Sequence, residues 1–336
     1  MKRLILVAGL LAAYSATAQD VIIERPGWAN PLIMESCSSS LCFEPPGWAY
    51  PLMDEGRGRG PDDGTLLSVP GSDLRLTQTQ IDDPFNPPNW YPDELPPMPQ
   101  AVSHGRPPNV RACGQCHMLH GMGHPESSIM AGLPVNYVIR QMQDYRSGDR
   151  TSLYRRHNSM LLSATHATDE EVRAAAEYYV AIEPVKWVTV IEAETVPETY
   201  VGPGNMRHPE PDGGTEPIGR RIIEIPEDSH LAERRDPHSP FIAYVPPGSI
   251  EAGLELATTG AGRTIQCYIC HGDDLKGLGD VPGIAGMSPI YVARQLWDIQ
   301  YGARTGTSAA LMLAVVANLT YDDVIALSAY VASLDP

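Results

Sequence analysis

The sequence predicts a mainly α-helical protein in which one helical module occurs twice. A long irregular N-terminal extension precedes the first module, and a connector with short strands separates the two. Three observations lead to this prediction: the motif C-x-x-C-H occurs at residues 113–117 and 267–271, similar helical segments follow each copy, and many of the 32 prolines lie outside the similar regions. Because 43% of the residues are hydrophobic, the chain can bury a core, which excludes global disorder.

Residues 1–18 have the features of an export signal. A basic pair precedes an apolar run at 4–13, and an A-T-A tripeptide at 16–18 follows it. A charged start, an apolar run of about ten residues and an A-x-A ending are typical of a secretory signal peptide. A membrane span would need about 20 apolar residues. We therefore expect cleavage after Ala18 and a mature chain in the periplasm with no membrane span.

The proline-rich N-terminal extension is expected to cover residues 19–98. Cys37 and Cys42 lie four residues apart within it. In an oxidising compartment this pair predicts a local disulfide, and the alternative is a free thiol pair or a thiolate that binds iron. The motif P-G-W-A occurs on both sides of the pair, at 26–29 and 46–49. We interpret it either as two turns with aromatic anchors or as a docking element that pins a partner or covers the first cofactor.

The two C-x-x-C-H motifs carry the most specific chemistry in the sequence. They consist of Cys113 and Cys116 before His117, and of Cys267 and Cys270 before His271. Two thiols at this spacing can each add to a vinyl group of one porphyrin, and the adjacent histidine can then bind the iron. A redox C-x-x-C needs no histidine, and a zinc site would need a second pair of ligands nearby. The sequence therefore predicts two covalently bound haem c groups, with His117 and His271 as iron ligands.

The regions around the motifs form an internal repeat, expected as module 1 at 99–182 and module 2 at 249–336. Residues 132–151 match residues 286–305 with an offset of 154, which is also the offset between the two motif histidines. The final segments of the modules match with an offset of 152, so a loop between these blocks differs by two residues. Two homologous haem modules follow from this match.

Each module is expected to end in a capped helix. Thr168 and Thr320 each precede an acidic residue by three positions, which is a capping-box spacing. The other expected helices cover residues 137–145 in module 1, and residues 249–257 and 291–301 in module 2. Before the first motif the sequence is proline-rich, so we expect no full leading helix in module 1.

The variable loop is expected to supply the second iron ligand of each haem. Met160 and Met312 are separated by 152, the offset of the final helices, and each lies eight residues before its capping threonine. Met287 has no methionine counterpart in module 1. His157 and His166 are the alternatives to Met160, and either methionine could instead be an ordinary core residue. Histidine–methionine ligation gives a higher reduction potential than two histidines.

Further residues near the haems are expected to bind or border them. The residues Tyr137, Arg150, Tyr291 and Arg304 are candidates for the haem propionates, because guanidinium and phenol groups bind carboxylates. The alternative is that these arginines lie at helix ends and face water. A backbone carbonyl near Pro282 is expected to orient His271, and the aligned position in module 1 is Ser128. We interpret His104, His120 and His124 as surface or haem-edge residues.

The connector at 183–248 is expected to pack against both modules. Residues 186–196 alternate like a strand, and 222–225 and 241–245 are short apolar runs of the same kind. A connection of about 60 residues is too long for an unstructured linker inside a compact protein. We therefore expect it to hold the two haems close together.

The order of helix, C-x-x-C-H, helix, methionine loop and final helix resembles that of the class I cytochromes c. The pairing of two such modules resembles the tandem di-haem cytochromes c of bacterial periplasms. The resemblance covers about half of the chain, at residues 99–182 and 249–335. It implies that the final helix of a module crosses the leading one and that the haem edge is exposed.

These expectations favour an electron-transfer protein over an enzyme, because a histidine–methionine iron has no open position for a substrate. The formal charge of −17 would steer a redox partner with a basic docking patch, or serve solubility alone, and it argues against nucleic acid. One alternative is a cytochrome subunit of a periplasmic dehydrogenase. Another is a di-haem peroxidase, which would need one iron to lose its methionine or histidine.

Overall fold

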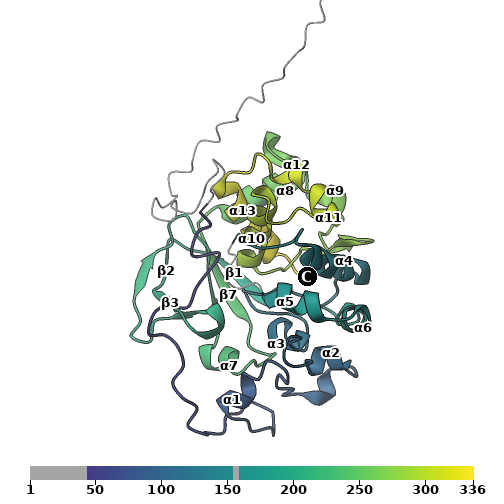
Figure 1. Cartoon of the computed structure of the whole chain (residues 1–336). Helices are drawn as coiled ribbons and strands as arrows, with labels where there is room; N and C mark the ends of the chain where they lie inside the picture. Colours follow the sequence, from purple (N-terminus) through teal and green to yellow (C-terminus); the bar gives the residue numbers. More distant parts are fainter. Residues whose placement is uncertain (1–43, 154–158) are drawn as a thin grey trace, which may run out of the picture. The chain divides into compact units, whose positions relative to one another are not determined.

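The computed structural model describes residues 44–153 and 159–336, and the compact unit within it runs from Pro45 to Pro336 (Figure 1). The expected signal peptide, the Cys37–Cys42 pair, the first P-G-W-A motif and His157 lie outside the described residues. No helix of the described ranges is long and apolar enough to cross a membrane.

The extension is irregular, as expected from its prolines. It contains one turn of helix, α1 (Gln78–Ile81), and a 3₁₀ turn, η2 (Pro92–Glu94). Ile81 packs with Val69 and Trp90 in a small core of its own. The Trp90 indole also donates a 2.8 Å hydrogen bond to the carbonyl of Arg234, so this core is attached to the connector.

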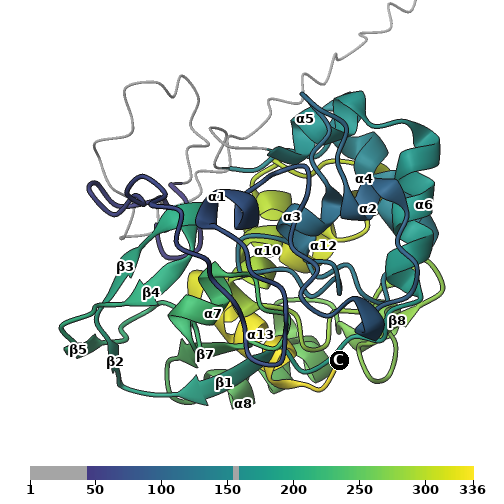
Figure 2. The same ribbon diagram turned by 90° about the horizontal axis from the view of Figure 1, so that it is seen from below.

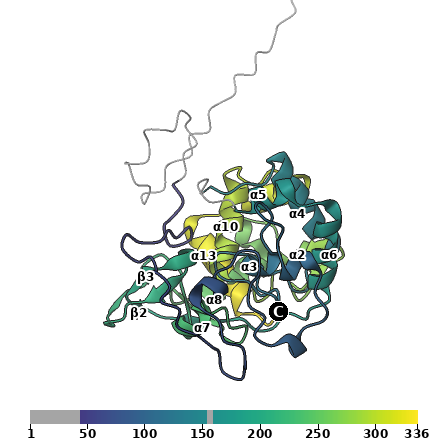
Figure 3. The ribbon, with the colours of Figure 1, turned by 60° about the horizontal axis from the view of Figure 1, so that its bottom comes forward.

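Module 1 contains a short leading helix and four further helices. They are α2 (Gln100–Ser103), α3 (Cys113–His117), α4 (Val135–Ser147), α5 (Ser159–His166) and α6 (Asp169–Val180). The single turn of α2 agrees with the prediction that module 1 has no full leading helix, and α2 packs against α6 (Figure 3). Thr168 and Glu171 form the expected capping box of α6. Helix α4 ends at Gly148, which has the left-handed conformation that glycine favours.

Module 2 has helices in corresponding places, with a complete leading helix, and it also contains two short strands and an additional short helix. The elements of module 2 are α8 (Ser249–Thr259), α9 (Tyr268–His271), β8 (Gly277–Leu278), β9 (Val281–Pro282), α10 (Pro289–Gln300), α11 (Thr307–Ala310), α12 (Leu313–Val316) and α13 (Tyr321–Ser333). Thr320 and Asp323 cap α13 as expected. Helices α8 and α13 lie side by side (Figure 1), and Gly253 allows their close approach, since a Cβ there would lie 2.1 Å from the carbonyl oxygen of Ala326.

The connector forms more strands than the sequence predicts, so the mainly α prediction is confirmed only in part. β1 (Val188–Glu192), β7 (Phe241–Val245) and β6 (Ile223–Pro226) form a sheet in the order β1-β7-β6, with β1 parallel and β6 antiparallel to β7. Strands β1 and β7 lie next to each other in Figure 2. The single strand expected over 186–196 is wrong, because the chain leaves β7 after β1. It then forms β2 (Thr195–Pro197) and pairs with β5 (Thr215–Pro217). The remaining elements are β3 (Thr199–Val201), η4 (Pro203–Asn205), β4 (Arg207–Pro209) and α7 (Ser229–Glu233).

One buried core joins the connector to both modules. It contains Val138 and Ala176 from module 1, Trp187 and Phe241 from the connector, and Tyr291 from module 2. The Trp187 indole donates a 3.1 Å hydrogen bond to the carbonyl of Gly123, in the loop after the first C-x-x-C-H motif. The connector therefore packs against both modules, as expected.

Candidate functional site

The first C-x-x-C-H motif lies at the wall of a cavity of about 590 Å³. The motif forms α3, and Cys113, Cys116 and His117 line the cavity together with Met160 of α5. Cavities of about 300–1,000 Å³ are typical of cofactor sites. The structure thus brings the expected thiols, histidine and methionine of module 1 to one cavity.

The two motif histidines have the same orientation. His117 Nδ1 lies 2.8 Å from the carbonyl oxygen of Ser128, and His271 Nδ1 lies 2.8 Å from that of Pro282. Because a carbonyl only accepts, Nδ1 carries the proton in each ring and Nε2 keeps its lone pair. Burial lowers the pKa of both histidines. Each ring therefore presents a neutral nitrogen suited to binding iron.

The four described cysteines are free thiols. Burial raises the pKa of Cys113 to about 12 and that of Cys267 to about 11. A dithiol oxidoreductase needs the opposite shift, since its attacking cysteine must be a thiolate near neutral pH. Cys113 and Cys267 therefore do not have the environment of such an attacking cysteine.

The candidate iron ligands of the variable loop differ in their surroundings. Met160 lines the cavity, whereas His166 is exposed and its Nδ1 lies 3.0 Å from the carbonyl oxygen of Leu162 in its own helix. Met312 of module 2 is half-buried at the start of α12. Met287 is 7% exposed in the core shared with the connector, which is the environment of an apolar packing residue.

Two buried arginines link the modules through a nearly symmetric set of hydrogen bonds. Arg150 donates to Gln141 Oε1 at 2.7 Å and to Gln295 Oε1 at 3.1 Å. Arg304 donates to Gln295 Oε1 and to Gln141 Oε1, both at 2.9 Å. The backbones of the two arginine segments also pair in an antiparallel bridge. With exposures of 6% and 8%, these arginines do not face water, so that alternative is wrong.

The arginine pair creates a positive potential. Within the described ranges, neither guanidinium forms an ion pair with a carboxylate. Arg150 also donates to the Tyr291 hydroxyl at 3.1 Å. Burial alone would raise the pKa of Tyr291, but Arg150 and Arg304 more than offset it and the pKa is lowered. A buried positive charge without a carboxylate partner suits an anionic group such as a haem propionate.

Several cavity residues come from outside module 1. Tyr50 belongs to the extension, Arg235 to the connector, and Arg294 and Asp298 to α10 of module 2. The Tyr50 hydroxyl donates to Asp298 Oδ1 at 2.9 Å, and Arg294 donates to the carbonyls of Ala49 and Pro125 at 3.0 and 2.6 Å. Sequence reasoning did not identify these residues or the two glutamines. The Tyr-x-x-Arg-Gln pattern, present in both modules, was the signal for the glutamines and for Arg294.

The second motif lies closer to the surface. Cys270 is exposed, and Ile269 is 62% exposed between the two cysteines. Leu278 and Leu311 are 62% and 77% exposed, on β8 and immediately before Met312. Tyr137 of module 1 differs from its counterpart Tyr291 in being only half-buried, and it lines the first cavity.

The additional histidines near the first motif have different environments. His104 is exposed, as expected of a surface residue. His124 lines the cavity, and burial lowers its pKa to about 3. His120 is half-buried and packed edge-on against Trp187, with ring centroids 4.9 Å apart, and it is not one of the residues that line the cavity.

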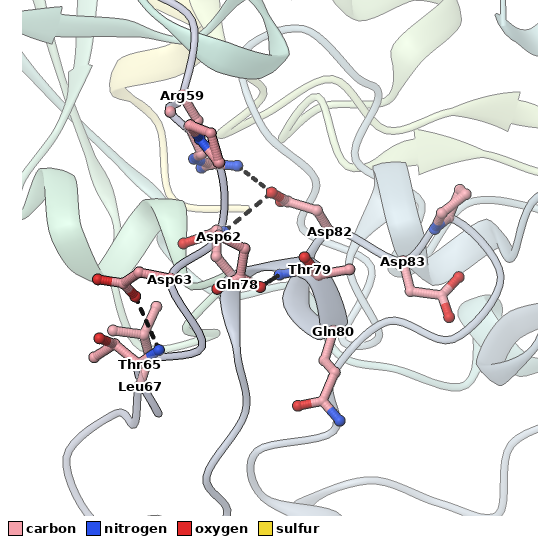
Figure 4. Close-up of a pocket in the computed structure, with 13 residues that line it drawn as sticks. Arg59, Asp62, Asp63, Thr65, Leu67, Gln78, Thr79, Gln80, Asp82 and Asp83 are labelled. Carbon is pink, nitrogen blue, oxygen red and sulfur yellow. Dashed lines mark hydrogen bonds and ion pairs between the residues drawn. The ribbon is translucent and has the colours of Figure 1, made fainter.

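A second cavity, of about 880 Å³, lies in the extension (Figure 4). Its carboxylates serve the local chain: Asp62 accepts hydrogen bonds from the amides of Gly64 and Thr79, and Asp82 pairs with Arg59. In the part of the chain that the structure describes, no group of three or more His, Cys, Asp or Glu side chains could hold a metal ion.

Comparison with known proteins identifies relatives of the chain, although no family model matches it. The thiosulfate dehydrogenase electron acceptor of Thiomonas intermedia is 25% identical over 217 residues, which cover 64% of this chain and 74% of the relative. Cytochrome c4 of Azotobacter vinelandii is 30% identical over 136 residues, covering 36% of this chain and 65% of the relative. Cytochrome c-554(548) of Halomonas halodenitrificans is 32% identical over 78 residues, which cover 23% of this chain and 94% of the relative.

Proposed function

The chain belongs to the class I c-type cytochromes, and from this premise we propose that it is a periplasmic relay in which module 1 holds an enclosed haem and module 2 a haem near the surface. It carries two covalently bound haem c groups and transfers electrons to and from protein partners. The proposal extends this to the place of each haem and to the residues that hold it.

In this proposal the haems are bound by Cys113, Cys116, His117 and Met160 in module 1, and by Cys267, Cys270, His271 and Met312 in module 2. These ligands would leave the iron no open coordination position, so the bound haem would supply one-electron transfer at this site. The supporting observation is the shared orientation of the two histidines, which directs Nε2 away from the carbonyl that fixes Nδ1. The module bounds of 99–182 and 249–336 belong to the same proposal.

The shared arginine pair would bind haem propionates. Gln141 and Gln295 accept from both arginines but carry no charge, so the positive charge of Arg150 and Arg304 is left for the carboxylates. A positive charge next to a haem favours the reduced iron, which carries less positive charge. The arginines therefore raise the reduction potentials. Because each arginine is hydrogen-bonded to glutamines of both modules, we expect both haems to have a raised potential.

Replacing Arg150 with methionine should lower both reduction potentials, and Arg304→Met should do the same. A redox titration followed by absorption spectroscopy measures the two potentials. Arg173→Met is the matched control, because Arg173 is exposed and its carboxylate partner Glu177 lies 3.9 Å away. Potentials that do not change in the Arg150 and Arg304 variants would contradict the propionate assignment.

The same titration tests the relay in the unmodified protein. We expect two one-electron steps, low-spin iron in both oxidation states and no turnover of hydrogen peroxide. High-spin iron or peroxide turnover would instead support a di-haem peroxidase.

A second candidate function is that of electron acceptor for a thiosulfate dehydrogenase. Two relatives carry this name; that of Stutzerimonas stutzeri is 27% identical over 235 residues, covering 68% of this chain and 82% of the relative. The charge of −17 predicts a basic docking patch on such a partner and a reduction rate that falls with added salt. Mixing the oxidised protein with a thiosulfate dehydrogenase and thiosulfate tests this candidate, since no reduction would reject it.

A further inference from the structure

Arg146, near the end of α4, holds the helix that carries Met160. Its Nε donates to the carbonyl of Ala164 at 2.6 Å, and its Nη2 donates to the carbonyl of Ala167 at 2.7 Å. These carbonyls belong to the last turn of α5 and to the residue after it, where the helix has no internal donors left. A cation also interacts favourably with this end of a helix.

Gln300, at the end of α10, makes the same pair of contacts in module 2. Its Nε2 donates to the carbonyl of Val316 at 2.7 Å and to that of Leu319 at 2.9 Å. Gln300 and Arg146 differ in number by 154, the offset between α4 and α10. The acceptors differ by 152, the offset of the methionines and the final helices. The two side chains are therefore equivalent, although one is charged and the other is neutral.

The held carbonyls lie one helical turn beyond each methionine. Met160 and Ala164 are four residues apart in α5. In module 2 the amide of Val316 donates to the carbonyl of Met312 at 3.0 Å. We call each pair of hydrogen bonds, from Arg146 or from Gln300 to two backbone carbonyls, a clamp. Each clamp fixes the turn that carries a methionine to the helix that follows the motif histidine of the same module.

We infer that Arg146 and Gln300 are positioning residues that hold Met160 and Met312 at bonding distance from the two irons. The inference rests on the proposed methionine ligation. A methionine–iron bond is sensitive to the position of its sulfur, and α5 and α12 are short helices of 8 and 4 residues. Helices of this length are marginal on their own, so contacts from outside must fix them.

The two clamps are not identical. Arg146 Nη1 also pairs with Asp169 Oδ1 at 2.5 Å, at the first residue of α6. The two carbonyl contacts are common to both modules, whereas the ion pair is confined to module 1. Arg146→Gln should therefore keep the clamp, since it reproduces the module 2 arrangement. Arg146→Met and Gln300→Met fill similar space without donors and should release it.

The test uses the oxidised holoprotein and its weak near-infrared methionine–iron band. Arg146→Met and Gln300→Met should each remove up to about half of the band, because each affects one of two haems, and should lower one potential while the other is unchanged. Arg146→Gln should retain the full band and both potentials. Arg173→Met is the control for the loss of an arginine. The ferrous Met variants should also bind carbon monoxide at one haem.

The outcomes separate this inference from the ligation on which it rests. An unchanged band and unchanged potentials in both Met variants would overturn the positioning role while leaving methionine ligation intact. Equal losses at both haems would also overturn it, because they indicate general unfolding. If Met160→Ala and Met312→Ala leave the band unchanged, the ligation itself is wrong.

Discussion

The two haem modules have the same local geometry in different surroundings. In both modules the motif histidine is 2.8 Å from a backbone carbonyl, the final helix begins with a capping box, and a side chain holds the methionine turn. The surroundings come from outside each module: the extension, the connector and α10 of module 2 line the first cavity. The repeat thus determines the chemistry of each site, and the chain packed around the module determines the exposure of the site.

The residue after each motif histidine shows how the modules reach one backbone conformation with different residues. Met118 has φ 62° and ψ 156°, and Gly272 has φ 86° and ψ 161°. This region is nearly restricted to glycine and costs other residues about 1–3 kcal/mol. In module 1 the Tyr179 hydroxyl donates to the Met118 carbonyl at 3.1 Å, a contact that Val331 cannot make at the aligned position.

The largest effect is expected from the contact of the extension with module 2. Trp48 packs against Trp297, with ring centroids 5.5 Å apart, and its indole donates to the Tyr321 hydroxyl at 2.6 Å. Trp48→Ala should lower the free energy of unfolding by about 3–5 kcal/mol, as for other buried aromatic residues. It should also increase the rate at which a small soluble reductant reduces the first haem, because Tyr50, two residues later, lines the cavity of module 1.

Thermal unfolding and stopped-flow reduction measure both effects of Trp48→Ala. Leu66→Ala is the control, because Leu66 also lies in the extension and is 61% exposed. If Trp48→Ala destabilises the protein but leaves the reduction of the first haem unchanged, the extension does not enclose this site.

A smaller effect is expected at the residue after the second motif. Gly272→Ala should destabilise the holoprotein by about 1–3 kcal/mol from backbone strain alone. The added Cβ would also lie 2.8 Å from the carbonyl oxygen of Gly277, so the loop must shift. Haem content and thermal unfolding measure the effect, with Gly148→Ala as the control, since Gly148 has positive φ but open space around it. If Gly272→Ala and Gly148→Ala have equal effects on haem content and thermal unfolding, the loop after the second motif tolerates a side chain.

A pH-dependent effect, small in each step of one pH unit, is expected at the start of α10. The connector makes a contact there that the start of α4 lacks. Glu224 Oε2 accepts from the Ser288 hydroxyl at 2.7 Å, whereas the cap residue of α4, Pro134, makes no side-chain contact of this kind. Burial raises the pKa of Glu224 to about 8, with the Ser288 and Ile290 donors and Arg294 opposing the rise and Glu126 adding to it.

The folded state holds the proton of the Glu224 carboxyl more tightly than the unfolded state does. The contribution of this group to the free energy of unfolding is therefore fully present at low pH. It should be lost as the pH rises through about 8. The slope should be at most about 1.4 kcal/mol per pH unit, and Glu224→Gln should remove it. Chemical denaturation between pH 5 and 9, in steps of about one unit, measures the slope. A Glu224→Gln protein with the wild-type slope would assign the pH dependence to other groups.

Sequence patterns predicted the features that depend on nearby residues. The capping boxes, the helix that begins at Ser249 and the carbonyl contact of His271 all follow from residues a few positions apart. The sequence did not reveal the sharing of Arg150 and Arg304 between two glutamines, or the contact of Tyr50 with Asp298. The contacts between the modules and with the extension join residues 145, 163 and 248 positions apart, and periodicity and spacing do not encode them. The prediction of a single strand over 186–196 is wrong for the same reason, because the partner strand changes from β7 to β5 along this segment.

The most direct test of the account is the near-infrared spectrum of the oxidised holoprotein and of two variants. Histidine–methionine ligation of both haems predicts a band with the intensity of two haems, and a loss of about half in Met160→Ala and again in Met312→Ala. The double variant should have no band. A wild-type band of one-haem intensity, or a Met160→Ala spectrum identical to that of the wild type, would contradict the account.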